Sequence, residues 1–312
     1  AVHFPFMAQM ATPATIAITH SVFNITATLV WLPFSNLLVK LACLTIRDDK
    51  VDEISREDQE FMILESRFLE KPAFAVEQGR NAAKHMEQDS RKILDIALGL
   101  IYSYSDEQAE RVQKLESKID RYEDELGTYL VKLNNKDLSE RDSHSVSIML
   151  HCIGDFERIS DHAVNIMESA QELHEKNISF SPQARNELQV LIAVVSRIVD
   201  TAYQVFDKQD LNLTRDVEPL EEIVDELSKE LKRRHVNRLR LGECTIEMGF
   251  ILTDLITSLE RIADHCSNIS VCVTQVRENL YDTHSHLENL KNEPDDSYYN
   301  RLGELHKEYV LP

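Results

Sequence analysis

The ten residues ERISDHAVNI, from Glu157 to Ile166, return as ERIADHCSNI from Glu260 to Ile269, with seven of the ten positions identical. Upstream of each copy, a Leu-Glu pair, an Asp and a Glu-Leu pair recur in the same order. Recurrence of two motifs in one order indicates an internal duplication, which is the sequence mark of a repeat architecture. We therefore expect two copies of one structural unit.

The composition favours long helices over a turn-rich β fold. The 312 residues include only 7 Gly and 8 Pro, while 28% of them are charged. Both breakers fall well below their usual share, and from residue 72 onward apolar residues recur with heptad-like spacing. Six helices joined by short loops predict antiparallel bundles, three helices to each repeat. The expected helices span about residues 72–103, 106–134, 139–175, 182–208, 212–241 and 244–278.

Local signals mark several helix ends. Pro72 suits a first helical position, and Ser139 with Asp142 resembles a capping box. Ser181-Pro182 opens the fourth helix, and Gly242 suits the position just beyond the fifth. The expected fold class is all-α, with tandem three-helix bundles related by a pseudo-twofold axis and preceded by one transmembrane helix.

Charge and cysteine content narrow the classes of function. A net charge of −20 argues against nucleic acid as a partner, since phosphate contacts need clustered Lys and Arg. Five cysteines without a CxxC pair argue against a disulfide framework and favour a reducing compartment. No nucleophile elbow, P-loop or Rossmann fingerprint occurs. We therefore assign no catalytic residue and do not expect an enzyme.

The first forty residues differ from the rest. No Asp, Glu, Lys or Arg occurs before Lys40, and the stretch from Thr15 to Phe34 is long enough to cross a bilayer. Basic residues follow this stretch and none precedes it, so the positive-inside rule places the C-terminal side in the cytoplasm. The alternative is a buried core helix of a soluble protein.

Two polar residues lie within that stretch. His20 and Asn24 are four residues apart and so share one helix face. Such residues in a membrane helix either pack against another helix or line a polar pathway. Both readings stay open, as a substrate path or as interhelical packing.

The twice-used E-R-I-x-D-H-x-x-N-I resembles the signature of PhoU, the phosphate-signalling protein, over about residues 72–278. The segment from ATIAITHSVFN to WLPF, which ends at Phe34, resembles the closing membrane segment of bacterial sodium/phosphate cotransporters. Some members of that family carry a PhoU-like C-terminal domain. The family's glutamine- and serine-rich substrate motifs do not occur in this sequence and would lie upstream of it.

The resemblance implies the C-terminal part of a sodium-dependent phosphate transporter in the inner (plasma) membrane. Its helical domain would be cytoplasmic and would regulate phosphate transport, while phosphate and sodium would bind the upstream transport domain. Assembly into a homo-oligomer stays open. The implied domains are residues 1–46 as the end of the transport domain, 47–71 as a linker, 72–280 as the PhoU-like domain (repeats 72–178 and 179–280) and 281–312 as a polar tail.

The spacing of acidic residues suggests a metal site in each repeat. Carboxylates at i and i+4 repel each other, and four such pairs in register suggest a cation that offsets the repulsion. All-oxygen ligand sets favour hard cations, namely Mg, Mn, Ca or iron. The resemblance points the same way, because PhoU proteins can hold metal clusters at ExxxD motifs. The candidate ligands are Glu116, Asp120, Glu157, Asp161 and Asn165 in the first repeat, and Glu221, Asp225, Glu260, Asp264 and Asn268 in the second.

We expect the acidic stripes of the middle and third helix to face each other within each repeat. His162 and His265 point about 100° away from the neighbouring Asp and are expected to pack rather than ligate. The alternative to a metal site is a solvated acidic face balanced by basic neighbours. Those neighbours are Lys118, Arg121, Arg158 and Arg261.

One strongly basic run, KRRHVNRLR from Lys232 to Arg240, is typical of a solvated helix end near the negative pole of the helix dipole. It could instead meet lipid headgroups or an acidic partner.

Two other functions stay open for the whole chain. One is a membrane-anchored signalling or adaptor domain, and the other is a di-metal bundle enzyme, although that class uses Glu-x-x-His at i and i+3.

Overall fold

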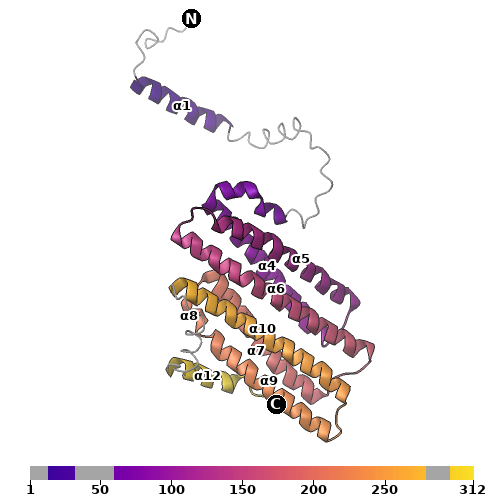
Figure 1. Ribbon diagram of the computed structural model, residues 1–312. Helices are drawn as coiled ribbons and strands as arrows, with labels where there is room; N and C mark the ends of the chain where they lie inside the picture. The colour runs from indigo at the N-terminus through magenta and orange to yellow at the C-terminus, as the bar shows by residue number, and fades with distance from the viewer. Residues whose placement is uncertain (1–12, 32–59, 279–295) are drawn as a thin grey trace. The chain divides into compact units, whose positions relative to one another are not determined.

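The computed structural model describes residues 13–31, 60–278 and 296–312, and every regular element in these ranges is a helix (Figure 1). The chain divides into two compact units, Ala1–Arg56 and Glu57–Pro312. The predicted boundary between residues 46 and 47, the end of the predicted membrane span after Trp31 and most of the linker lie outside the described residues.

The first unit contributes one described element, helix α1 (Pro13–Trp31). Its side chains between Ile16 and Val30 are apolar for the most part and nearly all exposed. Asn24 Nδ2 lies 3.0 Å from His20 Nε2, so these two residues share a face as their spacing predicts. At a rise of about 1.5 Å per residue the helix is about 28 Å long, close to the thickness of a bilayer's hydrocarbon core.

By length and composition, one described helix passes a test for crossing a membrane, and it is α7 (Pro182–Lys208). Half of its most apolar window is buried inside the helical bundle, as befits a core helix. A shorter apolar stretch, Ile16–Val30, lies within α1. Membrane insertion of α1 is therefore a proposal.

The second unit contains two successive three-helix units, which confirms the predicted all-α tandem fold. The first consists of α4 (Pro72–Leu100), α5 (Asp106–Asn134) and α6 (Glu140–Glu175). The second consists of α7, α9 (Val217–Arg240) and α10 (Ile246–Glu278). Predicted and observed helix ends agree within a few residues, except at the start of α9.

That start differs because of Pro219. The expected helix from residue 212 is split into a single turn, α8 (Leu211–Thr214), and α9, which begins at Val217. A proline ring clashes with the carbonyl four residues before it, so Pro219 fits the first turn of a helix but not its interior. Asp210 caps the N-terminus of α8 by accepting a hydrogen bond from the Asn212 backbone N–H at 2.9 Å.

The predicted caps are present. Ser139 Oγ accepts from the Asp142 backbone N–H, and Ser181 Oγ accepts from that of Ala184, both at 3.2 Å. Gly242 has a φ of +74°. Its N–H donates to the Leu239 carbonyl while the next N–H donates to the Arg238 carbonyl, the pair of bonds that defines a Schellman motif.

The third helices of the two repeats, α6 and α10, lie side by side through the middle of the bundle (Figure 1). Both copies of the duplicated ten residues therefore border the interface between repeats. Phe156 on α6 packs edge-on against Tyr203 and Phe206 of α7, with ring centroids 5.2 and 5.0 Å apart. In the same core, Ser90 Oγ donates to the Phe156 carbonyl and forms a second hydrogen bond with the Tyr203 hydroxyl.

Two segments outside the six long helices also pack onto the bundle. Residues 60–71, assigned to the linker, form the 3₁₀ turns η3 (Met62–Leu64) and η4 (Ser66–Glu70). Phe61 and Leu69 of this segment are buried. Near the C-terminus, α12 (Asp296–Glu308) packs along α9 and buries Leu305. The polar tail therefore contains a docked helix that the sequence analysis did not predict.

Glu87 on α4 is a half-buried acid, and its basic neighbour, Lys84, only partly compensates its charge. Its Oε2 is buried and forms no hydrogen bond within the described structure. Burial, followed by repulsion from Asp207, raises the pKa of Glu87 to about 7, and Lys84 offsets only part of this shift. The folded protein therefore retains a proton on Glu87 that the unfolded chain has already released.

This shift predicts a loss of stability as the pH rises from about 4.5 to 7, because the folded state binds the extra proton. We expect Glu87→Gln to remove that loss. The variant should gain about 1–2 kcal/mol over wild type at pH 8, after allowance for partial exposure, and nothing near pH 4.5. Urea unfolding at both pH values measures this. Glu168→Gln, at an exposed position of α6, controls for net charge; an equal gain in both variants would contradict the assignment.

Candidate metal centre

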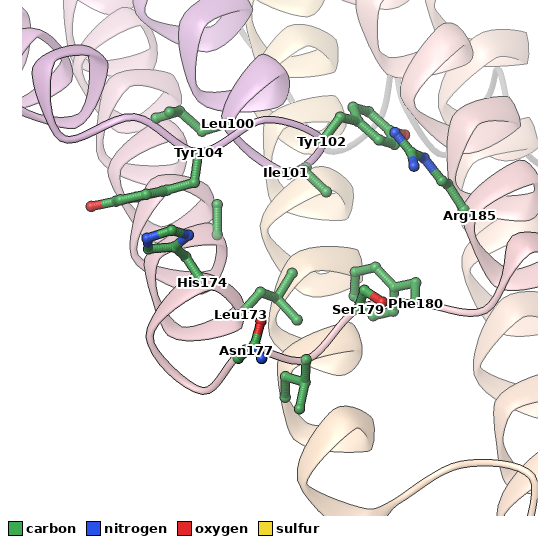
Figure 2. Close-up of a pocket in the computed structure, with 12 residues that line it drawn as sticks. Leu100, Ile101, Tyr102, Tyr104, Leu173, His174, Asn177, Ser179, Phe180 and Arg185 are labelled. Carbon is green, nitrogen blue, oxygen red and sulfur yellow. The ribbon is translucent and has the colours of Figure 1, made fainter.

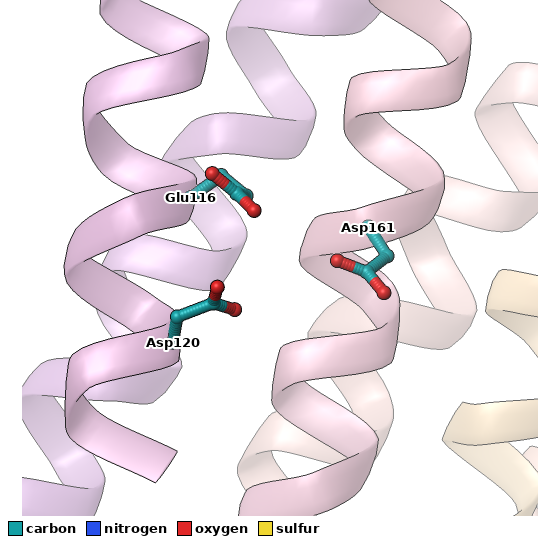
Figure 3. A group of neighbouring side chains, drawn as sticks. All are labelled: Glu116, Asp120 and Asp161. Atoms are coloured by element: carbon teal, nitrogen blue, oxygen red, sulfur yellow. The ribbon is translucent and has the colours of Figure 1, made fainter. Parts of the chain in front are cut away.

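Three carboxylates of the first repeat come together as the sequence predicts. Glu116 and Asp120 lie one turn apart on α5, and Asp161 faces them from α6 (Figure 3). One oxygen from each residue lies within 4.8 Å of the oxygens of the other two. Glu116 is half-buried, and both aspartates are exposed, so the group is open to solvent and to ions.

Within the described residues, no Lys, Arg or His forms an ion pair with Glu116, Asp120 or Asp161. The basic residues that the sequence offers as counterions on α5 pair elsewhere. Lys118 Nζ lies 2.6 Å from Glu60 and 2.7 Å from Asp89. Arg121 Nε lies 2.7 Å from Glu125, and its guanidinium lies over the Phe61 ring.

The electrostatics of the group favour a cation. Burial and then repulsion by Asp161 and Asp120 raise the pKa of Glu157, one turn before Asp161, to about 7, and only Arg158 opposes this. Burial and Asp120 raise the pKa of Glu116, while burial and Asp161 raise that of Asp120. Each shift records the cost of burial first and of crowded negative charges second, and a bound cation would offset the repulsion.

Asn165 continues the stripe one turn beyond Asp161 and is exposed. Its backbone carbonyl accepts a hydrogen bond from Ser169 Oγ at 3.0 Å. The oxygen donors that converge are therefore Glu116, Asp120 and Asp161, with Glu157 hydrogen-bonded to Asp161. A set made only of carboxylates fits a hard cation such as Mg²⁺, Mn²⁺ or Ca²⁺.

In the second repeat, the equivalent acids form ion pairs with basic side chains of the same repeat. Glu260 pairs with Lys232 at 2.6 Å, Asp225 with Lys229 at 3.1 Å and Asp264 with Arg261 at 3.1 Å. Glu221, the fourth of these acids, also interacts with another group. In the part of the chain that the structure describes, no second group of three converging carboxylates forms. Lysines of α9 take the place that a cation would have.

A comparison of the two copies explains this asymmetry. In register with Glu116 and Glu221, Lys229 and Lys232 of α9 correspond to Asp124 and Gly127 of α5. The first repeat therefore has no lysine where the second repeat has two. This signal was present in the sequence, and a position-by-position comparison of the repeats would have found it.

Asn268 and the two histidines lie at the interface between repeats instead. Asn268 Nδ2 donates to Asp155 Oδ1 at 3.3 Å, and His265 Nδ1 lies 2.9 Å from the same oxygen. The rings of His162 and His265 stack with centroids 5.7 Å apart. Both histidines therefore pack between α6 and α10, as expected from their angle to the acidic stripe. Asp155, which holds this contact, was not singled out in the sequence.

The basic run from Lys232 to Arg240 is largely neutralised within the chain. Arg233 and Arg234 pair with Glu230, and Lys232 pairs with Glu260. Arg234 and Arg238 both bind Glu187, which is fully buried on α7. Most of the run therefore stabilises the packing of α9 and is not available to a lipid surface.

Comparison with known proteins fits this architecture. A sequence model described as the PhoU domain matches residues 83–170 and 188–273, more than half of the chain and one match to each repeat. The phosphate-specific transport system accessory protein PhoU homolog 1 of Thermotoga maritima is 30% identical over 115 residues. That match spans 37% of this chain and 49% of the Thermotoga protein, so it covers about half of that relative's length.

The phosphate-specific transport system accessory protein PhoU homolog of Deinococcus radiodurans is 22% identical over 194 residues. The match covers 61% of this chain and 88% of that protein. Among solved structures, PhoU from Pseudomonas aeruginosa superposes with a TM-score of 0.61 at 23% identity, covering 66% of this chain and 98% of that one. The phosphate transport system regulatory protein PhoU from Streptococcus pneumoniae gives 0.60 at 17% identity, covering 68% and 100%. The two structures support the fold, and the two matched repeats establish the family: the chain belongs to the PhoU domain family.

Proposed function

We propose that this chain is the C-terminal part of a sodium-dependent phosphate transporter, whose PhoU domain lies in the cytoplasm and regulates phosphate transport. One observation carries the proposal: an uncharged, apolar α1 precedes a PhoU-type bundle in the same polypeptide. The matched relatives are named as accessory proteins of phosphate-specific transport. Fusion to a membrane segment would replace their separate association with a transporter by a covalent link.

The membrane part of the proposal rests on α1. It carries no formal charge, and its large apolar side chains between Ile16 and Val30 are exposed, an arrangement that is costly in water and favourable in lipid. His20 and Asn24 satisfy each other at 3.0 Å, which lowers the cost of placing both in a bilayer. In this proposal residues 1–46 end the transport domain and 72–280 form the regulatory domain. Residues 47–71 link the two, and the part of this linker from residue 60 packs onto the bundle.

The regulatory domain would hold a hard cation, a divalent metal or iron, at the group formed by Glu116, Asp120 and Asp161. Glu157, which is hydrogen-bonded to Asp161, would be a further oxygen donor. The cation would supply positive charge where several carboxylates raise one another's pKa. Because the donors come from α5 and α6, occupancy would tie these two helices together. The second repeat makes the same connection with lysine ion pairs.

The test uses a strain from which the gene has been deleted. We expect altered phosphate uptake in that strain and a normal rate once the complete gene, which would encode both the upstream transport domain and this chain, is supplied. A variant with Ile18→Asp and Val22→Asp should fail to restore uptake, because each charge opposes insertion by roughly 2.5–3.5 kcal/mol near a membrane centre. Radiolabelled phosphate uptake and carbonate extraction of membranes are the measurements.

Val131→Asp is the matched control, because Val131 is an equally exposed apolar residue on the bundle. It should stay in the membrane fraction and restore uptake. Two results would count against the proposal. One is a deletion strain with unchanged uptake, and the other is a wild-type chain that carbonate releases from membranes.

A further inference from the structure

A pocket lies at the end of the bundle, where the α4–α5 connection meets the α6–α7 connection (Figure 2). Its volume is about 220 Å³, and its floor contains Leu173. Tyr102 and Tyr104 come from the first connection, His174 and Phe180 from the end of α6 and the turn that follows, and Arg185 from α7. The pocket is separate from the acidic group between α5 and α6, and the function proposed above does not use it.

Planar side-chain groups line the pocket. Tyr104 and His174 stack with ring centroids 4.7 Å apart and planes at 22°. The Arg185 guanidinium lies 4.8 Å from the centroid of the Tyr102 ring. Figure 2 shows these two stacks from opposite sides of the pocket, with Phe180 near the second. Aromatic faces and guanidinium planes presented in this way suit a planar ring of a ligand.

The charge of the pocket is opposite to that of the chain. The net charge of the chain is −20, yet no Asp or Glu lines this pocket. Within the described structure, Arg185 forms no ion pair with a carboxylate, and its guanidinium contacts the Tyr102 ring. The N-terminus of α7, capped by Ser181, lies one turn before Arg185 and adds partial positive charge. An anionic group is therefore favoured at this side.

An unsatisfied hydroxyl gives an independent indication. The Tyr102 hydroxyl is buried and has no hydrogen-bond partner in the described structure, a condition that native proteins rarely leave uncompensated. In Figure 2 the Tyr102 ring and the Arg185 guanidinium lie next to each other. Within the described structure neither the hydroxyl nor the guanidinium has a hydrogen-bond acceptor. A ligand oxygen bound to the exposed Arg185 side chain would supply an acceptor on this side of the pocket.

We infer that this pocket binds a nucleoside monophosphate, with its base among the aromatic walls and its phosphate against the exposed Arg185 guanidinium, beside the Tyr102 ring. The volume is below the roughly 300–1,000 Å³ of pockets for drug-sized ligands, so one base fits and a dinucleotide does not. Arg185 and His174 are exposed, which leaves room for the ribose and phosphate at the rim. An inorganic anion alone would leave the aromatic walls unused.

The test is calorimetric titration of the full chain with AMP, and with adenosine and inorganic phosphate as separate probes. AMP should bind saturably and at least about tenfold more tightly than either fragment. Arg185→Gln should weaken AMP binding about tenfold or more, as expected for loss of a charge-assisted hydrogen bond. Tyr102→Phe should weaken it about threefold without lowering the melting temperature, since it removes an unsatisfied buried hydroxyl.

Arg215→Gln is the matched control, because Arg215 is exposed directly after α8 and the charge change is the same. It should leave AMP binding unchanged. The inference is overturned if AMP does not bind saturably, if Arg215→Gln weakens binding as much as Arg185→Gln, or if inorganic phosphate binds as tightly as AMP.

Discussion

Replacing Glu187 with Gln should lower the free energy of unfolding by about 3 kcal/mol at pH 7. Glu187 is fully buried on α7 and binds Arg234 Nη1 at 2.9 Å and Arg238 Nη1 at 2.8 Å. Arg238 is itself only 9% exposed. Removing the carboxylate charge leaves a buried guanidinium without its counterion, and loss of one partner of a buried pair typically costs about 3–5 kcal/mol. Urea unfolding of the wild type and the variant measures the difference.

Glu308→Gln is the control for this prediction. Glu308 also pairs with an arginine, Arg197, at 2.7 Å, but this pair is exposed at the surface. The same chemical change should therefore cost less than about 1 kcal/mol. Equal losses in the two variants would show that burial of Glu187 does not set its contribution. The contrast matters because Arg234 also donates to the Pro312 carbonyl at 2.7 Å, so the same network holds the end of the chain.

The Glu187 network also shows where sequence reasoning stops. Glu187 lies in a polar stretch near the start of α7, and nothing local distinguishes it from the exposed acids that are common on helices. Its partners follow 47 and 51 residues later on α9. Only the rotation of α7 against α9 decides that this acid is buried, and the sequence carries no signal of that rotation.

The helices themselves could be predicted for local reasons. Pro72, Ser139 and Ser181 mark helix starts through backbone geometry and hydrogen bonds that involve only near neighbours. By contrast, α12 is a 13-residue helix, a length at which an isolated helix is marginal in water. Its formation depends on burial of Leu305 and on the pairing of Arg301 with Asp216, and both involve other helices.

The acidic group was predictable in part. Helical spacing places Glu116 above Asp120 and Glu157 above Asp161, and a short loop between α5 and α6 makes them antiparallel neighbours. The convergence of the two stripes follows from there. The difference between repeats was also written in the sequence, as Lys229 and Lys232, but it becomes meaningful only when α9 and α10 are seen to bring lysine and acid within 2.6 Å.

That difference permits a prediction with an internal control. Addition of Mn²⁺ or Mg²⁺ to the metal-free full chain should stabilise it by about 2.7 kcal/mol when free metal is a hundred times its dissociation constant. Asp161→Ala should abolish this gain, because it removes the donor from α6 and leaves the pair on α5 without a partner. Thermal unfolding with EDTA and with added metal measures the response. Without metal, Asp161→Ala should be at least as stable as wild type, since repulsion with Glu157 and Asp120 disappears.

Asp264→Ala is the matched variant in the second repeat, where Arg261 already pairs with the carboxylate at 3.1 Å. It should retain the full metal response, because the cations of the second repeat come from the chain itself. A wild type that does not respond to metal would leave a solvated acidic face as the account of Glu116, Asp120 and Asp161. Equal loss of the response in both variants would mean that the repeats hold metal symmetrically and that the lysines of α9 give way to it. Retention only in Asp264→Ala would place the metal between α5 and α6, where three carboxylates converge and α5 has Asp124 and Gly127 in place of the lysines of α9.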